Sequence, residues 1–599
     1  MYELDKPDNL VEMFEQSVAR FADNEWLGTK NEAKDGYDWV TYRQAADRVD
    51  NLRAGLAHLG VEKGSTVAII ANNRVEWAIA CYATYGRCAR FVPMYEAELE
   101  KIWKYIVSDS GTRVLLVSKP GIFETVKGWV NEIDSLEHVI LIEGKGPGTM
   151  EELERIGSKN PVKSVYPDAG DIAGLIYTSG TTGDPKGVLL SHGNFTSNVH
   201  AAGKTLHQLD ETCRTLSFLP WAHSFGQTAE LHFLMSRGAS TGFAESPKTI
   251  VDDLPLLKPG FLVAVPRIFN RVYDGLRAKM DDEGGVAKFL FDMGVEAGQK
   301  RREMAKEGKS CFWTNLKFAV ADKIVFQKIR DKFGGRLECC LSSSAALSPH
   351  IAEFFFDIGI PVYEAWGMTE LSPAAAINSP DEFRIGSVGK AIDKVRFVID
   401  RSVPLDDPRE GELIVYGPNV MQGYHNKPEK TRETMTEDGG LRTGDQAYID
   451  DDGFLYITGR IKEQFKLENG KFVYPAAMEE EIKLLPWVEY AMIHGLNQPF
   501  TVCLVYPDFE VMKKYAPEKG FPSDPEEMAQ DPKFRQFIED EIVRHLKGKF
   551  GSYEIPKQYI ILSEGFTVEN GMLTQTLKLK RREVMKSYGD AIDSAYRNN

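Results

Sequence analysis

Short apolar runs alternate with longer helical patterns along much of this chain. Four runs are strand-like because each is short, mostly apolar and bounded by polar or turn-forming residues: Thr66 to Ala71, Arg113 to Val117, His138 to Ile142 and Phe261 to Val265. Helical patterns lie between several of them. Strands that alternate with helices predict parallel sheets covered by helices, which is an α/β fold.

The clearest helix start lies at Thr41-Tyr-Arg-Gln44, which has the threonine and glutamine of a capping box. The helical period after it places five apolar residues on one face: Ala45, Val49, Leu52, Leu56 and Leu59. We expect the helix to end at Gly60, since glycine commonly follows the last helical turn.

A loop rich in glycine and hydroxyl residues separates two apolar runs. It reads Tyr177-Thr-Ser-Gly-Thr-Thr-Gly-Asp-Pro-Lys-Gly187, with Ile172 to Ile176 before it and Val188 to Leu190 after it. This order predicts strand, loop and strand. Glycines let backbone N–H groups approach an anion, and the side chains add donors, so the loop suits a polyphosphate. The candidate binding residues are Ser179, Gly180, Thr181, Thr182, Gly183 and Lys186.

The loop lacks the Gly-Lys-Ser/Thr ending of the Walker motif. A glycine-rich surface hairpin is the simpler alternative, but eleven residues of this composition are more specific than a short Gly/Ser pattern.

A domain boundary is expected near Asp450-Asp-Asp-Gly-Phe-Leu-Tyr-Ile-Thr-Gly-Arg-Ile-Lys462. Its Asp-Gly pair favours a turn, and Phe454 to Ile457 follows as a strand. We therefore predict a large domain over residues 1–458 and a small α+β domain over residues 459–599. This division agrees with the length of 599 residues, which is too great for one hydrophobic core.

The composition is that of a globular protein, with 43% hydrophobic and 27% charged residues, which argues against disorder. A net charge of −16 argues against a nucleic-acid binder but not against ATP. Met1 to Val11 lacks the apolar core of a signal peptide, and we find no apolar run of membrane-spanning length. The seven cysteines show no paired CxxC spacing, which favours reduced thiols, a cytoplasmic location and no zinc site.

The segment from Gly284 to Gly335 differs from its surroundings. It carries two basic helical patterns, around Gln299-Lys-Arg-Arg302 and from Lys323 to Lys332. A charged helical face is normally solvated surface, and we favour that interpretation. Peripheral contact with an anionic membrane surface stays open as the alternative.

Taken with the segments that follow it, the 177–187 loop resembles the phosphate-binding signature of the adenylate-forming superfamily of acyl-CoA synthetases, amino-acid adenylation domains and luciferases. The resemblance extends from about Phe21 to Lys586. It implies large helix-covered, mostly parallel sheets with a β-barrel-like subdomain, followed by a small mobile α+β domain. The insertion that runs into Phe333-Gly-Gly-Arg-Leu is similar to that of the long-chain fatty acyl-CoA synthetases.

Several segments match the superfamily's nucleotide site. In Tyr363-Glu-Ala-Trp-Gly-Met-Thr-Glu370, the resemblance implies that Thr369 contacts the α-phosphate and that Glu370 lies near Mg²⁺, for which oxygen ligands are suitable. Trp366 stands where the family usually has tyrosine and is expected to stack on adenine. The remaining nucleotide-binding candidates are Glu364, Ala365, Gly367, Met368, Ser344 and Ala345, the last two from Leu341-Ser-Ser-Ser-Ala-Ala-Leu-Ser-Pro349.

Further matches lie between these segments and the boundary. His223 in Leu219-Pro-Trp-Ala-His-Ser-Phe225 matches the family histidine that gates or contacts the carboxylate, although a lone histidine is more often structural. The resemblance assigns the ribose hydroxyls to Asp445, a second ribose or phosphate contact to Arg460, and the hinge to Lys462 or a near neighbour. Lys466 and Gly470 match the loop beside the pantetheine tunnel, where thioester forms.

The catalytic lysine of the family lies on a C-terminal loop, here Asn570-Gly-Met-Leu-Thr-Gln-Thr-Leu-Lys-Leu-Lys-Arg-Arg582. We assign Lys578, with Lys580 as the alternative, while a basic tail is the non-catalytic interpretation.

The resemblance implies a fatty acid–CoA ligase that uses ATP, Mg²⁺ and CoA and forms an acyl-adenylate, with a long-chain acid as the preferred substrate. Thr182, His223, Glu370 and Lys578 are its catalytic candidates. Two alternatives remain: an enzyme that acts on another carboxylic acid or loads a carrier protein, and a non-catalytic acyl- or nucleotide-binding protein.

Overall fold

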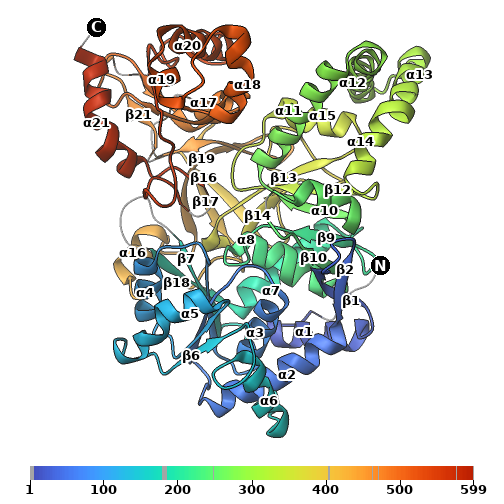
Figure 1. Ribbon diagram of the computed structural model, residues 1–599, viewed down its shortest axis with the longest axis vertical. Helices are drawn as coiled ribbons and strands as arrows, with labels where there is room; N and C mark the ends of the chain where they lie inside the picture. Colours follow the sequence, from blue (N-terminus) through green and yellow to red (C-terminus); the bar gives the residue numbers. More distant parts are fainter. Residues whose placement is uncertain are drawn as a thin grey trace.

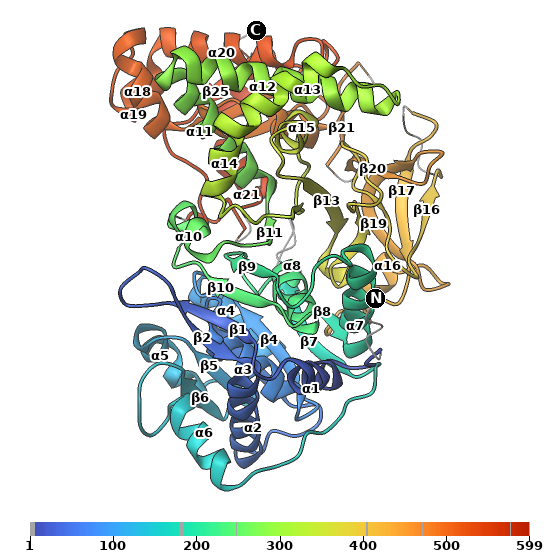
Figure 2. The ribbon, with the colours of Figure 1, turned by 90° about the vertical axis from the view of Figure 1, so that its right-hand side faces the viewer.

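The computed structural model describes residues 6–178, 185–246, 248–402, 405, 407–461, 463–469, 471–574 and 577–597. The predicted residues Ser179, Gly180, Thr181, Thr182, Gly183, Lys462 and Gly470 lie outside these ranges. The chain folds into two large helix-covered sheets, a smaller antiparallel sheet and a C-terminal part, which lies at one end of the long axis (Figures 1 and 2). The predicted α/β fold is therefore confirmed.

The first sheet has seven strands in the order β18-β8-β7-β4-β3-β5-β6. Its strands are β3 (Thr66–Ile70), β4 (Arg90–Met94), β5 (Val114–Val117), β6 (His138–Leu141), β7 (Ile172–Thr178), β8 (Lys186–Ser191) and β18 (Gly423–Tyr424). Strands β3 to β7 pair in parallel, and β8 pairs antiparallel with β7 and β18. The predicted strand, loop and strand around residues 177–187 is thus the β7–β8 pair.

The second sheet has nine strands in the order β15-β14-β13-β12-β11-β9-β10-β1-β2. They are β1 (Glu25–Lys30), β2 (Tyr37–Thr41), β9 (Arg214–Ser217), β10 (Ser240–Phe243), β11 (Phe261–Ala264), β12 (Cys339–Ser342), β13 (Val362–Gly367), β14 (Ala374–Ile377) and β15 (Lys390–Ala391). The strands from β1 to β13 in this order are parallel. The carboxyl ends of β12 and β13 therefore meet at one edge, where parallel sheets commonly bind ligands.

Helices cover both sheets and bury their apolar faces. Those of the N-terminal half are α1 (Leu10–Phe21), α2 (Tyr42–His58), α3 (Val75–Tyr85), α4 (Glu100–Asp109), α5 (Pro120–Val126), η1 (Lys127–Asn131), α6 (Met150–Lys159), α7 (His192–Thr205), α8 (Ser224–Gly226), η2 (Gln227–Phe233), α9 (Leu234–Ser236) and α10 (Ile250–Leu257). Helix α2 begins with the predicted capping box at Thr41, buries Ala45, Val49, Leu52 and Leu56, and is followed by Gly60 at φ +75°.

The remaining helices of the large domain follow β11 and β12. They are α11 (Pro266–Glu283), α12 (Gly285–Lys306), α13 (Phe312–Ala321), η3 (Asp322–Phe326), α14 (Gln327–Lys332), α15 (Pro349–Asp357), η4 (Thr369–Leu371) and α16 (Pro428–Thr434). Helices α12 to α14 form the predicted insertion and lie at the outer edge of the molecule (Figure 1).

An antiparallel four-stranded sheet joins these layers to the C-terminal part. Its order is β16 (Arg396–Asp400), β17 (Gly411–Tyr416), β19 (Leu441–Ile449) and β20 (Leu455–Arg460). Residue Asp445 on β19 lies opposite Arg460 on β20 in this sheet. This register brings two predicted ribose contacts together, although fifteen positions separate them in the chain.

The C-terminal part has its own apolar core. It contains β21 (Phe465–Lys466), β22 (Phe472–Val473), α17 (Pro475–Ile482), β23 (Val488–His494), β24 (Val502–Pro507), α18 (Phe509–Lys519), α19 (Pro525–Gln530), α20 (Pro532–Leu546), β25 (Gln558–Ile561) and α21 (Arg581–Arg597). Two hydrophobic clusters lie on the faces of its three-stranded sheet, and both consist of residues from Phe465 onward. A separate core of this kind is the mark of a domain.

Candidate functional site

A cavity of about 2040 Å³ lies between the carboxyl ends of β12 and β13 and the C-terminal part. Fourteen of the predicted site residues line it: Lys186, His223, Ser344, Ala345, Glu364, Ala365, Trp366, Gly367, Met368, Thr369, Glu370, Asp445, Arg460 and Lys578. Three sheets and a C-terminal loop thus converge on one space.

Asp445 is the most enclosed charged group of the site, with 3% of its surface exposed. Its Oδ1 forms an ion pair with Arg460, whose Nε lies 2.9 Å away, and its Oδ2 accepts a hydrogen bond from Trp366 Nε1 at 3.0 Å. Burial raises the pKa of Asp445, while Arg460, Trp366 and Lys578 oppose that rise. The carboxylate is therefore fixed in orientation from two sides.

The Trp366 contact adds to what the sequence predicted. The side chain lines the cavity, where a flat ring could stack on a base, and its indole N–H also holds Asp445. The indole thereby supplies a donor at the position where tyrosine would carry a hydroxyl. The ring meets Phe397 edge to face, with centroids 6.4 Å apart, which fixes the plane of the indole.

Glu370 is buried at the end of β13, within η4. Its Oε1 accepts a hydrogen bond from the Tyr424 hydroxyl at 2.7 Å. Burial, and after it the Glu370 carboxylate, raises the pKa of that phenol. Lys186 Nζ lies 4.8 Å from the centre of the same ring. Tyr424 therefore connects the predicted metal ligand to the base of the glycine-rich loop, and its role was not evident from the sequence.

Thr369 precedes Glu370 and is also buried. Its Oγ1 accepts a hydrogen bond from Ser224 Oγ at 3.2 Å, which leaves the Thr369 hydroxyl proton available to another acceptor in the cavity. A threonine hydroxyl and a carboxylate are oxygen donors, and Mg²⁺ with its phosphate ligands prefers few protein oxygens. The donor set here fits that ion.

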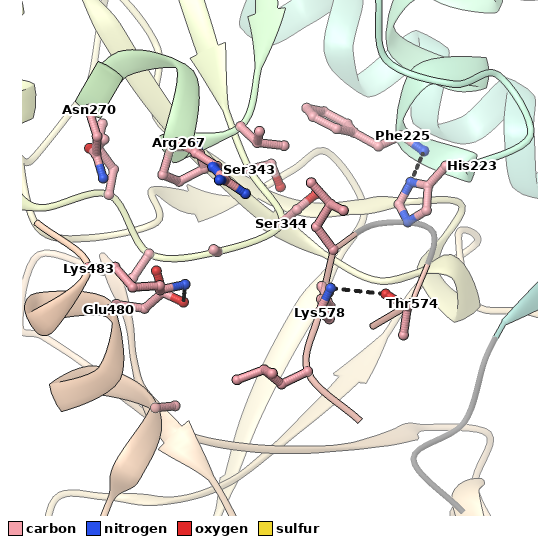
Figure 3. Close-up of a pocket in the computed structure, with 18 of the residues that line it drawn as sticks. His223, Phe225, Arg267, Asn270, Ser343, Ser344, Glu480, Lys483, Thr574 and Lys578 are labelled. Carbon is pink, nitrogen blue, oxygen red and sulfur yellow. Dashed lines mark hydrogen bonds and ion pairs between the residues drawn. The ribbon is translucent and has the colours of Figure 1, made fainter. Parts of the chain in front are cut away.

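His223 stands at the start of α8, and its Nδ1 accepts the backbone N–H of Phe225 at 3.2 Å (Figure 3). An accepting Nδ1 fixes the neutral tautomer with its proton on Nε2. Burial, with help from the charge of Lys578, lowers the pKa of His223 to about 4. The histidine is therefore neutral near pH 7 and presents an N–H donor to the cavity.

Lys578 lies on the loop before α21 and faces the cavity (Figure 3). Its backbone N–H donates to Thr574 Oγ1 at 3.0 Å. Lys578 lines the cavity while keeping part of its surface exposed to solvent, and desolvation by the neighbouring protein groups lowers its pKa. Arg460 lowers that pKa further, while Asp445, Glu463 and Glu370 oppose the effect.

Lys580 also lines the cavity, but its surroundings differ from those of Lys578. Its charge contributes, after Lys586 and Arg582, to lowering the pKa of Glu583 on helix α21. The carboxylates at the nucleotide end of the cavity act on Lys578 instead. This difference favours the first assignment, which the sequence left open.

Two loop segments shape the adenine end of the predicted site. Ser344 has a φ of +78°, an unusual conformation for a residue other than glycine, and it lies two residues after the end of β12. The backbone N–H of Leu347 donates to Glu364 Oε1 at 3.1 Å, and burial raises the pKa of Glu364 to about 7. The predicted residue Glu364 thus supports the loop that carries Ser344 and Ala345.

Apolar side chains form part of the cavity lining, and we call this set of residues the apolar branch. They belong to α8, η2, α7 with the residue after it, and the second sheet: Phe225, Ala229, Phe233, Ala202, Leu206, Phe261, Leu341, Ala374 and Ile377. The segment η2 is a π-helix, and such wide turns are frequent at functional sites. The branch offers contact to an unbranched or aromatic apolar group next to polar chemistry.

Arg267 crosses from the large domain to the C-terminal part. Its Nη2 donates to Glu489 at 2.8 Å and its Nη1 donates to the Tyr490 hydroxyl at 3.1 Å. The guanidinium also lies 5.4 Å from the centre of the Tyr490 ring. Sequence reasoning missed this clamp because its partners lie more than two hundred residues apart.

The predicted CoA-loop residue Lys466 is placed differently. It lies on β21, is exposed, and faces the ring of Phe472 at 5.5 Å rather than the cavity.

The comparison with known proteins decides the family. The AMP-binding enzyme family matches residues 14–425, and the AMP-binding enzyme C-terminal domain matches residues 462–599. The chain is a member of the AMP-binding enzyme family. The predicted resemblance is therefore confirmed over nearly the whole chain.

Relatives of this AMP-binding enzyme include long-chain members. It is 31% identical to "Fatty acyl-CoA synthetase A" of Dictyostelium discoideum, over 97% of this chain and 89% of that protein. It is 30% identical to "Long-chain-fatty-acid--CoA ligase 5" of Rattus norvegicus, over 100% and 90%. Among solved structures, the adenylation domain of a carboxylate reductase from Mycobacterium chelonae superposes with a TM-score of 0.77 at 21% identity, over 98% of this chain and 91% of that one. The anthranilate CoA ligase AuaEII gives 0.73 at 20% identity, over 98% of both chains.

Proposed function

We propose that this enzyme is a long-chain fatty acid–CoA ligase that converts a fatty acid, ATP and CoA into acyl-CoA, AMP and pyrophosphate. The observation that carries the proposal is the single cavity in which Asp445, Thr369, Glu370 and Lys578 adjoin an apolar branch. The names of the relatives supply the substrate class: they describe fatty acyl-CoA synthetases and long-chain ligases.

In the first step a carboxylate oxygen attacks the α-phosphorus of ATP, and the bond to pyrophosphate breaks. No general base is needed because the carboxylate is already a nucleophile, so catalysis rests on position and charge. The Lys578 ammonium would bridge carboxylate and phosphate oxygens, and His223 Nε2–H would orient the carboxylate. Glu370 would hold Mg²⁺ with the phosphates and Thr369 would contact the α-phosphate, while the 179–186 loop would hold the pyrophosphate.

In the second step the CoA thiol attacks the acyl carbon of the mixed anhydride, and AMP leaves. We infer that the division at residues 458 and 459 lets the C-terminal domain turn about Lys462 between the two steps. The position of Lys466 supports this inference, because Lys466 lies outside the cavity while Lys578 lies inside it. A rotation of the C-terminal domain would move Lys578 out of the cavity and bring Lys466 into it.

The substrate class is tested with fatty acids of increasing chain length and with AMP release measured with and without CoA. We expect kcat/KM to rise with chain length until the apolar branch is filled, and thioester to form only with CoA. Greater activity with short or aromatic acids would refute the long-chain assignment. Acyl transfer to a carrier protein but not to free CoA would refute the ligase.

The lysine assignment is tested by comparing Lys578→Ala with Lys580→Ala. Loss of one preorganised donor commonly costs on the order of a hundredfold or more in rate. We expect that loss in acyl-adenylate formation for Lys578→Ala only, with thioester formation from supplied acyl-adenylate retained. The reverse pattern would move the role to Lys580. As a complementary test, Gly470→Val should keep adenylation and lose thioester formation.

We also propose a reducing location such as the cytoplasm. All seven cysteines are free in the structure, and six of them are buried. Burial raises the pKa of thiols such as Cys340 and Cys503, which makes them unreactive. Fractionation of cells should recover the enzyme with all seven thiols titratable after unfolding without reductant. Recovery of fewer thiols would contradict the proposal. None of the helices in the described ranges combines the length and apolar character that a membrane span requires.

A further inference from the structure

The insertion carries an exposed apolar stripe that the reaction does not use. Its residues are Phe312, Trp313, Leu316, Val320 and Ile324, which we call the α13 stripe. Their exposed fractions are 71%, 68%, 44%, 39% and 44% in that order. Phe312 and Trp313 contact one another edge to face at 5.5 Å, so two large rings stand together at the start of the helix.

The stripe follows the period of a surface helix. Trp313, Leu316, Val320 and Ile324 are spaced by three or four residues, which places them along one side of α13 and η3. The opposite side is the one that packs: Phe318, Ala321, Val325 and Phe326 join the core of the second sheet's helices. The helix therefore has two separate apolar sides: one packs in the core, and the α13 stripe is exposed.

The core-facing side is independently anchored. Arg301 on α12 lies 4.1 Å from the centre of the Phe318 ring, and α13 packs against α12. Gly294 on α12 lies so close to Ala321 and Phe326 that a Cβ there would approach them at 2.5 and 2.6 Å. The two helices are thus closely packed, and the stripe has no structural task in holding them together.

Basic residues flank the stripe in a chain that is acidic overall. Between Gly308 and Lys328 there are four lysines and one acidic residue, whereas the whole chain has a net charge of −16. The one acidic residue, Asp322, forms an ion pair with Arg330, whose Nη1 donates to it at 2.7 Å. Lys317, Lys323 and Lys328 are exposed and form no ion pair within the part of the chain that the structure describes.

An apolar helix face with aromatic residues and flanking lysines is suited to bind the surface of an anionic bilayer. Aromatic rings favour the headgroup level, and lysine stems can extend from apolar contacts to phosphate groups. A protein partner would need a complementary acidic rim, and a second copy of this acidic chain would meet its like charge. Helix α13 lies at the outer edge of the molecule (Figure 1), and the side chains of the stripe are exposed there.

We propose that the α13 stripe and the lysines at positions 317, 323 and 328 dock this enzyme on an anionic membrane surface. The aromatic pair enters the interface and the lysines contact headgroup phosphates. This proposal does not depend on the acid that the enzyme activates.

The first experiment measures co-sedimentation of the full chain with phosphatidylglycerol–phosphatidylcholine vesicles and with pure phosphatidylcholine vesicles. We expect binding to the anionic vesicles that weakens as salt is added, because surface charges are screened. Absence of binding to anionic vesicles at low salt would overturn the proposal. Equal binding to both vesicle types would overturn the part assigned to the lysines.

Two variants locate the contact. Phe312→Ser with Trp313→Ser should weaken vesicle binding about tenfold or more, because two rings no longer leave water. The triple variant of Lys317, Lys323 and Lys328 to Gln should weaken it by about fivefold for each lysine at low salt. The altered side chains are exposed, so the melting temperature and the rate with a water-soluble short-chain acid should not change.

Matched controls alter the same chemistry elsewhere. Leu496→Ser with Val251→Ser removes two exposed apolar side chains, of 51% and 64% exposure, from other surfaces. The triple variant of Lys101, Lys145 and Lys159 to Gln lowers the net charge by the same three units. Controls that lose as much binding as the stripe variants would overturn the proposal. So would light scattering that finds a dimer in the parent and a monomer in the Phe312/Trp313 variant, with no vesicle binding.

Discussion

The bond between Trp366 and Asp445 offers the sharpest test of how the nucleotide end is built. The substitution Trp366→Phe keeps an aromatic ring in the cavity and removes only the indole N–H. Asp445 Oδ2 then loses the donor at 3.0 Å, and the carboxylate keeps the ion pair between Oδ1 and Arg460 Nε at 2.9 Å. With 3% of its surface exposed, the carboxylate has little access to replacement water.

The expected magnitude follows from these contacts. A hydrogen bond to a charged group contributes about 1.5–3 kcal/mol, and a fraction of that loss is recovered when ATP brings its ribose hydroxyls. We therefore expect the lower end, near 1.4 kcal/mol, which is a tenfold rise in the KM for ATP. The kcat should stay within about twofold, because Asp445 holds the ribose equally before and during the reaction.

The pH dependence has a definite sign. Trp366 is one of the groups that oppose the rise in the pKa of Asp445, so its loss moves that pKa further upward. The carboxylate of the variant is then protonated at a higher pH than in the parent. The KM ratio of variant to parent should therefore grow as the pH is lowered.

Carboxylate-dependent ATP–pyrophosphate exchange measures this KM directly. Trp313→Phe is the matched control, since Trp313 is 68% exposed and remote from the cavity. A double-mutant cycle with Asp445→Asn gives the interaction free energy between Trp366 and Asp445. A KM within twofold of the parent, or a coupling energy near zero in a folded protein, would refute the reasoning.

Three further predictions concern the groups around this site. Tyr424→Phe removes the donor at 2.7 Å to Glu370, so we expect a Mg²⁺ requirement raised about threefold to tenfold in exchange assays; an unchanged Mg²⁺ titration would contradict it. Arg267→Ala removes the clamp to Glu489 and Tyr490, so adenylation should slow about fivefold to twentyfold while thioester formation from supplied acyl-adenylate is spared; equal slowing of both steps would contradict a role in one arrangement of the domains. Burial raises the pKa of Glu364 to about 7, so this group's contribution to stability is full below pH 4.5 and is lost as the pH rises through 7. Glu364→Gln should therefore gain stability relative to the parent by up to about 3 kcal/mol between pH 5 and pH 8 in urea titrations, and a pH-independent difference would refute the shift.

Local patterns predicted the fold well because they depend on neighbours in the chain. The capping box at Thr41 and the strands on either side of residues 179–185 follow from periodicity and turn chemistry alone. The order of the strands within the sheets does not, because it depends on long-range pairing.

The candidate site was predictable where a motif names its residues. Thr369, Glu370, Asp445 and Arg460 do meet in one cavity, as the resemblance implied. Tyr424 and Arg267 were not predicted, since each acts through a partner distant in sequence and neither belongs to a recognised motif. The sequence predicted that Trp366 stacks on a base but not that its indole N–H donates to Asp445. That hydrogen bond depends on how β19 lies relative to β13, which the sequence pattern does not give.

The β7–β8 ladder has a consequence for the energetics of nucleotide capture. Thr178 pairs with Lys186, and Tyr177 pairs with Gly187, so both ends of the glycine-rich loop are fixed by the sheet. A Cβ at position 187 would approach the Tyr177 ring at 3.0 Å, which shows how closely the two strands lie at that point. The entropic cost of closing the loop is thus met during folding, and ATP need not supply it from its own binding energy. Substitutions that loosen this ladder should raise the KM for ATP without touching any group that contacts phosphate.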